Sequence, residues 1–285
     1  MKRILLLFLL LFSISLTIYS EVKYEFYSEV KYEFRNNILY EDGKPATGMF
    51  ELKHGKYRMS GEFLNGMPNG IFDGYFDNKR ILTRDVYKKG KVLKQEVFYK
   101  NGSLLAKMSN GNFELYFDDG QPLISLNKSK KTAIVYHENG KPMMITNEKI
   151  GETTLYDENN EIIFKLINGK IANTDGVTTK RLENGLFQIL KYNRVVTDMD
   201  TNNIVNYYYS TGEIMFRTDL NKKTTEFLLK NGRVFLSGTI DKQTLYYKNR
   251  KQMFEINKGV AELYDESGEK IINDFSNIMN IKKIN

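Results

Sequence analysis

The sequence contains no cysteine, no tryptophan, only two histidines and only four prolines among its 285 residues. Without cysteine, disulfides, thiolate metal sites and lipid attachment at a processed cysteine are excluded. The histidines, His54 and His137, fall in separate predicted turns and outside any H-E-x-x-H pattern. G-x-S-x-G, P-loop and dinucleotide-binding motifs are absent too. We therefore expect no catalytic residues, no metal site and no cofactor.

The first 20 residues differ in composition from the rest of the chain. Lys2 and Arg3 precede an apolar run, Ile4–Phe12, which continues more weakly to Ile18 before charged sequence begins at Glu21. A basic start followed by a short apolar segment is typical of a secretory signal peptide. It is short for a membrane span, which needs about 20 residues. We expect an exported, periplasmic or envelope-associated protein, and an uncleaved N-terminal anchor is the alternative.

Charge is mildly basic and dispersed. Loss of Lys2 and Arg3 with the signal peptide lowers the basic residues from 42 to 40, against 35 acidic residues, and leaves a net charge of +5. Basic clusters occur near predicted turns at Lys88–Lys94, Lys128–Lys131 and Lys248–Lys251. We interpret them as solvated turns, with an anion-binding patch as the alternative. Nucleic acid is not an expected partner.

The chain repeats one short unit, best seen at Val135–Met144, V-Y-H-E-N-G-K-P-M-M. An aromatic residue ends an apolar run, Asn-Gly makes a turn and a second apolar run follows. Variants occur at Phe98–Leu105, Tyr116–Leu123, Tyr156–Ile163, Tyr208–Met215, Tyr246–Met253 and Tyr264–Ile271. Successive turn positions from 102 to 268 are 18 or 20 residues apart, except between 160 and 212, and Asn160 and Arg250 replace glycine. Such a period indicates a repeat architecture.

Turn chemistry predicts that each unit is a β-hairpin. Twelve Asn-Gly or Asp-Gly dipeptides occur, and these accept the positive φ angles of tight antiparallel turns. Every proline lies two residues after a turn glycine, which fits the start, edge or bulge positions that proline occupies in sheets. The structural turn glycines we expect are Gly43, Gly66, Gly70, Gly102, Gly120, Gly140, Gly212, Gly232 and Gly268.

An aromatic stripe accompanies these turns. The position four residues before the turn residue is aromatic at Phe98, Tyr116, Tyr136, Tyr156, Tyr208 and Tyr264. Cross-strand aromatic pairs stabilise sheets, and a repeat must bury one face on its neighbours. We expect the stripe to pack between hairpins, and a ligand platform is the alternative.

The stretch Gly61–Phe72, G-E-F-L-N-G-M-P-N-G-I-F, resembles the MORN-repeat family, especially its bacterial variant repeats. The resemblance extends over Leu39–Lys165 and, in degraded form, Asn206–Lys270, whereas Gly169–Asn206 fits poorly and holds either a longer hairpin or a divergent repeat. It implies antiparallel hairpins laid side by side in an elongated sheet. Bacterial proteins with such repeats are often assigned to an antitoxin-like family, and MORN-type repeats have been linked to phospholipids.

These observations predict an all-β fold, an elongated antiparallel β-meander in a single twisted layer. We expect a signal peptide at 1–20, a hairpin-repeat domain at 21–270 and a tail or capping helix at 271–285. The helix is suggested by Ile272, Phe275, Ile278 and Met279 at helical spacing. The second E-V-K-Y-E-F copy, Glu29–Phe34, predicts a half-buried strand, as does the first.

One segment, Asp198–Asn203, places oxygen ligands at alternate positions like the start of a calcium loop. Asn203 and Tyr209 stand where such loops need Gly and Glu, so we interpret it as an Asx-rich loop. For function we expect a non-catalytic repeat protein that binds or scaffolds a protein or envelope partner, with an anionic membrane surface as a variant. A toxin-neutralising protein is the alternative, and an enzyme is the least expected class.

Overall fold

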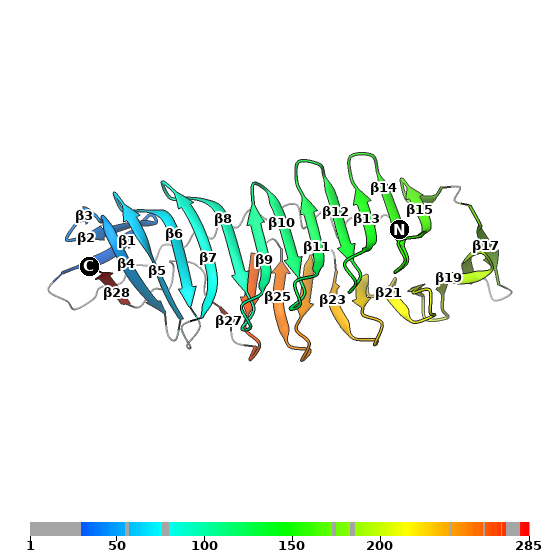
Figure 1. Cartoon of the computed structure of the whole chain (residues 1–285). Helices are drawn as coiled ribbons and strands as arrows, with labels where there is room; N and C mark the ends of the chain where they lie inside the picture. The colour runs from blue at the N-terminus through cyan, green and yellow to red at the C-terminus, as the bar shows by residue number, and fades with distance from the viewer. Residues whose placement is uncertain are drawn as a thin grey trace. The chain divides into compact units, whose positions relative to one another are not determined.

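The computed structural model describes residues 30–54, 57–75, 80–172, 175–182, 186–239, 241–258, 260–268, 270–271 and 280–284. They fall into two compact units, an N-terminal unit within Thr17–Gly120 and Ile271–Asn285 and a C-terminal unit within Gln121–Lys270. The described elements are all β-strands, which confirms the predicted all-β meander (Figure 1). The predicted signal peptide and the first E-V-K-Y-E-F copy lie outside the described residues.

The N-terminal unit contains a small sheet and a larger one. Strands β1 (Tyr32–Arg35), β2 (Ile38–Glu41) and β3 (Lys44–Pro45) form the small sheet. The larger sheet has the order β28-β4-β5-β6-β7-β8-β9-β10, and all the strand pairs described in it are antiparallel. Its strands are β28 (Asn280–Ile284), β4 (Gly48–His54), β5 (Tyr57–Leu64), β6 (Met67–Tyr75), β7 (Ile81–Lys88), β8 (Lys91–Phe98), β9 (Leu104–Ser109) and β10 (Asn112–Tyr116).

Strand β28 replaces part of the expected C-terminal helix. Residues 272–279, which carry the apolar pattern that suggested a helix, lie outside the described residues. The described tail pairs along β4, with Ile284 opposite Met49 and Lys283 opposite Phe50. The Lys283 ammonium also reaches Glu41 at 2.8 Å. A strand from the end of the chain thus covers the edge of β4, which would otherwise expose unpaired backbone groups.

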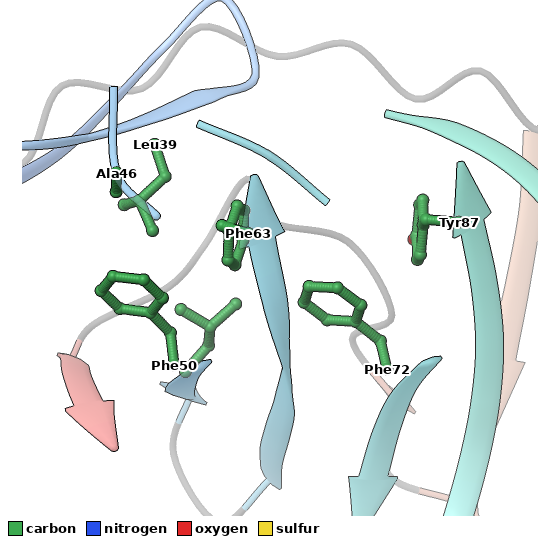
Figure 2. Packing of buried hydrophobic residues seen from close by; sticks show 7 residues of the cluster. Leu39, Ala46, Phe50, Phe63, Phe72 and Tyr87 are labelled. Atoms are coloured by element: carbon green, nitrogen blue, oxygen red, sulfur yellow. The ribbon is translucent and has the colours of Figure 1, made fainter. Parts of the chain in front are cut away.

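Aromatic rings form the core of the N-terminal unit (Figure 2). Phe50, Phe63, Phe72 and Tyr87 come from four successive strands, and neighbouring rings meet edge to face with centroids 5.7, 5.2 and 5.2 Å apart. Each such pair adds about 0.5–1.5 kcal/mol beyond the burial of its area. From the second E-V-K-Y-E-F copy, Tyr32 contacts Phe50, so β1 is tied to this ladder.

The C-terminal unit contains two sheets. The β11–β16 sheet consists of β11 (Pro122–Asn127), β12 (Thr132–Tyr136), β13 (Pro142–Asn147), β14 (Glu152–Tyr156), β15 (Ile162–Ile167) and β16 (Lys170–Ile171). The β17–β27 sheet consists of β17 (Val177–Arg181), β18 (Phe187–Lys191), β19 (Arg194–Met199), β20 (Ile204–Tyr208), β21 (Ile214–Asp219), β22 (Thr224–Leu228), β23 (Val234–Gly238), β24 (Lys242–Tyr246), β25 (Gln252–Asn257), β26 (Val260–Tyr264) and β27 (Lys270–Ile271). The last residue, Ile271, lies just past the unit boundary.

The chain changes sheet where the sequence repeat breaks. Strand β16 ends one sheet, and β17 begins the other without pairing to it. Both lie within the poorly fitting stretch Gly169–Asn206, which holds β16–β19 and a tight turn with positive φ at Tyr192 and Asn193. The break in the repeat therefore marks the passage from one sheet to the next.

Aromatic contacts show that the two sheets of the C-terminal unit face each other. The ring of Phe164 in β15 lies 6.2 Å from that of Tyr207 in β20, and both side chains are buried. Tyr207 stacks on Phe216 with centroids 3.9 Å apart, and Phe216 stacks on Phe227. The meander is therefore doubled into two layers here, which the sequence prediction of a single layer did not include.

The turns explain the glycine spacing. In the hairpin between β12 and β13, the Gly140 N–H donates to the His137 carbonyl and the His137 N–H donates to the Lys141 carbonyl. This is a type I turn closed by a bulge residue at positive φ, and Gly140 has φ 77°. All nine glycines named in the sequence have positive φ, and so do the substitutes Asn160 (73°) and Arg250 (67°).

Candidate binding surface

The aromatic stripe is only partly buried. Its six members, Phe98, Tyr116, Tyr136, Tyr156, Tyr208 and Tyr264, all have intermediate exposure. The residue before each is turned to the opposite face, and in the C-terminal unit it is buried: Val135, Leu155, Tyr207 and Leu263. The stripe thus lies on the outer face of each sheet, by which we mean the face opposite the buried side chains.

The residues that form the buried ladder were not among those predicted from the sequence. Tyr207, Phe216 and Phe227 stack in register across β20, β21 and β22. The signal was present, because the position five before the turn residue is apolar or aromatic in every unit: Val97, Leu115, Val135, Leu155, Tyr207, Phe227, Leu245 and Leu263. The tyrosines at the next position form a more obvious pattern, and the prediction was based on them.

Three tyrosines on the outer face of the β17–β27 sheet form what we call the outer tyrosine row: Tyr208, Tyr246 and Tyr264. Their hydroxyls are fixed by neighbouring side chains. Tyr208 donates to Asp198 at 3.0 Å, Tyr264 donates to Glu262 at 2.6 Å, and the Tyr246 hydroxyl lies 3.0 Å from Ser237 Oγ. Tyr246 was not among the predicted stripe residues, although it stands four residues before Arg250, the substitute for the turn glycine.

The carboxylates that accept these bonds raise the pKa of two of the phenols. Burial and then the hydrogen bond to Asp198 raise the pKa of Tyr208 to about 12. For Tyr264 the hydrogen bond to Glu262 is the larger cause and burial the second, and the pKa is again about 12. Both phenols remain protonated at neutral pH. They present fixed aromatic faces to solvent instead of freely rotating ones.

Charged residues lie beside the outer tyrosine row and are largely paired within the sheet. Arg217 in β21 donates to Glu226 in β22 at 2.6 Å, and these residues are directly opposite each other in the ladder. Lys242 lies 3.0 Å from Glu255, and Lys270 lies 2.6 Å from Glu262. The surface therefore combines ordered aromatic rings with fixed charges of both signs.

Adjacent hairpins are joined in pairs through two side chains of one turn. His137 Nε2 lies 3.2 Å from the Tyr156 carbonyl of the next hairpin, and Asn139 Nδ2 donates to the Glu158 carbonyl at 2.9 Å. Tyr99, Tyr209 and Tyr247 replace His137 in equivalent turns, and each donates its hydroxyl to the next hairpin. Because a carbonyl can only accept, His137 Nε2 carries the ring proton.

The two sheets of the C-terminal unit are also linked through one acidic residue. Glu158, in the turn between β14 and β15, accepts hydrogen bonds from the Ser210 hydroxyl and backbone and from Lys230 at 2.9 Å. We call this set the Glu158 clamp. Burial opposes ionisation of Glu158, but the bonds from Ser210 and Lys230 outweigh it and lower its pKa to about 2. The carboxylate is therefore ionised at neutral pH.

The Glu158 clamp brings a serine and an acid into the region of His137, but their geometry is not that of a catalytic triad. Ser210 bonds to a carboxylate that is too weak a base to activate it. His137 is 2% exposed, and burial lowers its pKa. Its Nε2 donates to the Tyr156 carbonyl, and within the described residues its Nδ1 makes no hydrogen bond. Among the described residues no base is positioned on Ser210, and the observed contacts link the two sheets.

The segment proposed as a calcium loop forms an Asx-rich turn. The Asp200 carboxylate accepts the backbone N–H groups of Asn202 and Ile204, both at 2.9 Å. Asp198 accepts from Asn206 and Tyr208, so it belongs to the outer face of the sheet instead. Over the described part of the chain, no group of three or more His, Cys, Asp or Glu side chains could hold a metal ion. No helix in that part is long and apolar enough to cross a membrane.

Other predicted sites belong to the N-terminal unit. Gly43, Gly66 and Gly70 belong to the N-terminal unit, where the Gly66 N–H donates to the Ala46 carbonyl and its own carbonyl accepts from Leu39. These bonds fasten the turn between β5 and β6 to the small sheet. The side chain of His54 lies outside the described residues.

Comparison with known proteins adds little. No protein-family model and no curated protein matches the sequence. Among solved structures, the wild-type TCP10 domain of Danio rerio CPAP is 15% identical, with 63% of this chain and 93% of that chain covered and a TM-score of 0.24. The same domain in complex with a peptide of Danio rerio STIL is 12% identical, with 84% of this chain and 99% of that chain covered and a TM-score of 0.21. A Bacteroides caccae protein of unknown function is 12% identical, with 91% of this chain and 96% of that chain covered and a TM-score of 0.21. Scores this low support no argument about function.

Proposed function

We propose that this chain is an exported, non-catalytic binding scaffold, and that the outer face of its β17–β27 sheet receives a protein partner at the cell envelope. One observation carries the proposal: the outer tyrosine row is partly exposed, and each of its hydroxyls is fixed by a neighbouring side chain. Tyrosine is enriched in the residues that dominate binding energy at protein interfaces. Rings that are already ordered lose little conformational entropy when a partner binds.

The build of the sheet supports the same proposal. Side chains of one turn bond to backbone carbonyls of the adjacent hairpin, as His137 and Asn139 do. The Glu158 clamp and the stacked inner rings hold the two layers together. Such a scaffold presents side chains at fixed spacing along the sheet.

The test is capture of a partner from an envelope extract. The purified chain, immobilised at low density, is expected to retain a protein in a saturable manner. Changing the outer tyrosine row to serine (Y208S, Y246S, Y264S) removes the ordered rings and should abolish retention. The matched control is Y136S with Y156S, which removes equivalent stripe residues from the outer face of the β11–β16 sheet and should leave retention unchanged.

Two results would overturn the proposal. One is consistent failure of the wild-type chain to retain any protein in a saturable manner. The other is retention by the triple variant with undiminished affinity, provided that circular dichroism shows both variants to be folded. A toxin-neutralising role stays a prediction from the sequence resemblance, because no structural observation favours it over other protein binding.

A further inference from the structure

A shallow cavity of about 320 Å³ opens on the outer face of the β17–β27 sheet, beside Tyr246 in the outer tyrosine row. It is lined by residues of β22, β23, β24 and two turns, namely Glu226, Gly232, Arg233, Val234, Ser237, Tyr246 and Arg250. Its size is at the lower end of the range for sites that hold small molecules or single side chains.

Two guanidinium groups distinguish this cavity. Arg233 immediately precedes β23 and Arg250 ends the turn between β24 and β25. Neither forms an ion pair with any described residue. By contrast, the acidic residue that lines the cavity, Glu226, is already neutralised by Arg217 at 2.6 Å. The lining therefore carries two uncompensated positive charges. Guanidinium forks match carboxylates in a bidentate geometry, which makes an anionic ligand the natural occupant.

Arg250 is also out of place in the repeat. It has φ 67° at a position where six of the eight equivalent turns from residue 102 to 268 have glycine and one has asparagine. A long side chain in this left-handed conformation is strained, and glycine would relieve the strain. Other turns also hold a long side chain at positive φ, as at Lys131 and Lys223, so it is the cavity that singles out Arg250.

We infer that this cavity is a carboxylate site for an acidic segment of the protein partner. The inference rests on the proposed function, and it assigns the chemistry of one subsite on that surface. One Asp or Glu side chain of the partner lies between Arg233 and Arg250, and the adjoining residue packs on the ring of Tyr246. A peptide is favoured over a saccharide or phosphate because tyrosine and arginine together are typical of the dominant residues in protein interfaces.

The experiment uses the full chain and four soluble probes at low salt: blocked tetraglutamate, blocked tetraglutamine, glucuronate and inorganic phosphate. Binding is followed by NMR through the arginine Nε–H signals and the ring signals of Tyr246. Tetraglutamate is expected to shift the signals of Arg233, Arg250 and Tyr246, while tetraglutamine leaves them in place. Added salt should weaken the binding, because the charged groups are exposed.

Two variants identify the residues responsible. R250G and R233Q should each weaken tetraglutamate binding by at least about tenfold. R250G also removes the strain, so its melting temperature should rise, and its loss of binding cannot reflect misfolding. The matched control is N160G, which introduces glycine at the same turn position in the β11–β16 sheet and should leave binding unchanged.

The inference is overturned if tetraglutamate leaves these signals unmoved, or if R250G binds as well as wild type. Equal or tighter binding of glucuronate or phosphate at the same residues would overturn the peptide assignment. These failures can be told from failure of the proposed function. If the triple tyrosine variant still loses the envelope partner, only the subsite is refuted; if it keeps the partner, the function itself is refuted.

Discussion

The carboxylate of Glu158 lies 2.9 Å from the ammonium of Lys230, although 72 residues separate them in the chain. Glu158 belongs to the turn between β14 and β15, and Lys230 belongs to the turn between β22 and β23. The bond therefore joins the two sheets of the C-terminal unit. Together with Ser210 it holds the carboxylate in its ionised form and lowers its pKa to about 2, against the opposing effect of burial.

Replacing Glu158 with glutamine should destabilise the chain by about 1–2 kcal/mol at pH 7, because a hydrogen bond to a charged group is lost. The pKa of Glu158 in the folded chain lies below the usual value of 4.5. Ionisation of this carboxylate therefore stabilises the fold, fully so above pH 4.5. The difference between wild type and E158Q should shrink as pH falls from about 4.5 to 2. Urea denaturation at several pH values measures it. E138Q changes an exposed glutamate at the same position of the preceding turn and should leave stability at pH 7 unchanged.

The side chain of Asn139 joins two hairpins. Its removal should therefore lower the free energy of unfolding more than removal of an ordinary turn asparagine. Its Oδ1 accepts the Lys141 N–H at 3.0 Å, and its Nδ2 donates to the Glu158 carbonyl at 2.9 Å. We expect N139A to lower stability by about 1–2 kcal/mol. Asn159 has the same place in the next turn, but its side chain makes no hydrogen bond within the described residues. Equal loss of stability in N159A, measured by denaturant unfolding, would contradict the role assigned to Asn139.

Asp85 in β7 is a buried carboxylate whose ionisation opposes folding. Burial raises its pKa to about 7, although hydrogen bonds from Gln95 and Tyr87 act in the other direction. The native pKa exceeds the ordinary value of 3.8, so the native state binds the proton more tightly than the unfolded chain, and stability falls as pH rises from about 4 to 7.

Replacing Asp85 with asparagine removes this charge and keeps a hydrogen-bonding group. D85N should be more stable than wild type by about 1–3 kcal/mol at pH 8 and nearly equal to it at pH 4. Thermal unfolding at the two pH values checks this. A stabilisation of the same size at both pH values would show that packing, and not ionisation, is responsible.

Gly61 faces the ring of Phe72 directly across β5 and β6. A Cβ atom at Gly61 would lie 2.4 Å from Phe72 Cγ, so alanine would force the ring out of the ladder that Phe72 makes with Phe63 and Tyr87. G61A should cost about 1–3 kcal/mol. The neighbouring change S60A, on the other face of β5, should cost less than about 0.5 kcal/mol. Comparable losses in chemical denaturation of the two variants would disprove the close approach.

Much of this fold follows from local chemistry that the sequence displays. Turn glycines, or their substitutes Asn160 and Arg250, at spacings of 18 or 20 residues indicate hairpins, because the turn position needs positive φ, and Gly140 and its equivalents have it. Pro122 and Pro142 begin β11 and β13, where no ladder donor is needed. A meander requires only these local rules, since each strand pairs with its neighbour in the sequence.

Features that depend on distant residues could not be predicted in the same way. The pairing of β28 with β4 joins segments at opposite ends of the chain. The contact of Phe164 with Tyr207 requires the chain to double back, and hairpin chemistry does not specify that. The outer position of Tyr208 and its equivalents depends on which of two adjacent aromatic residues turns inward, and the run Tyr207–Tyr208–Tyr209 offers no hydrophobic contrast to decide it.

The central claim is that the outer tyrosine row meets the partner. Hydroxyl-radical footprinting of the chain, alone and saturated with the protein that it captures from the envelope, tests this most directly. We expect oxidation of Tyr208, Tyr246 and Tyr264 to fall several-fold in the complex, while that of Tyr136 and Tyr156 is unchanged. Unaltered oxidation of the first three residues, with protection elsewhere in the chain, would contradict it.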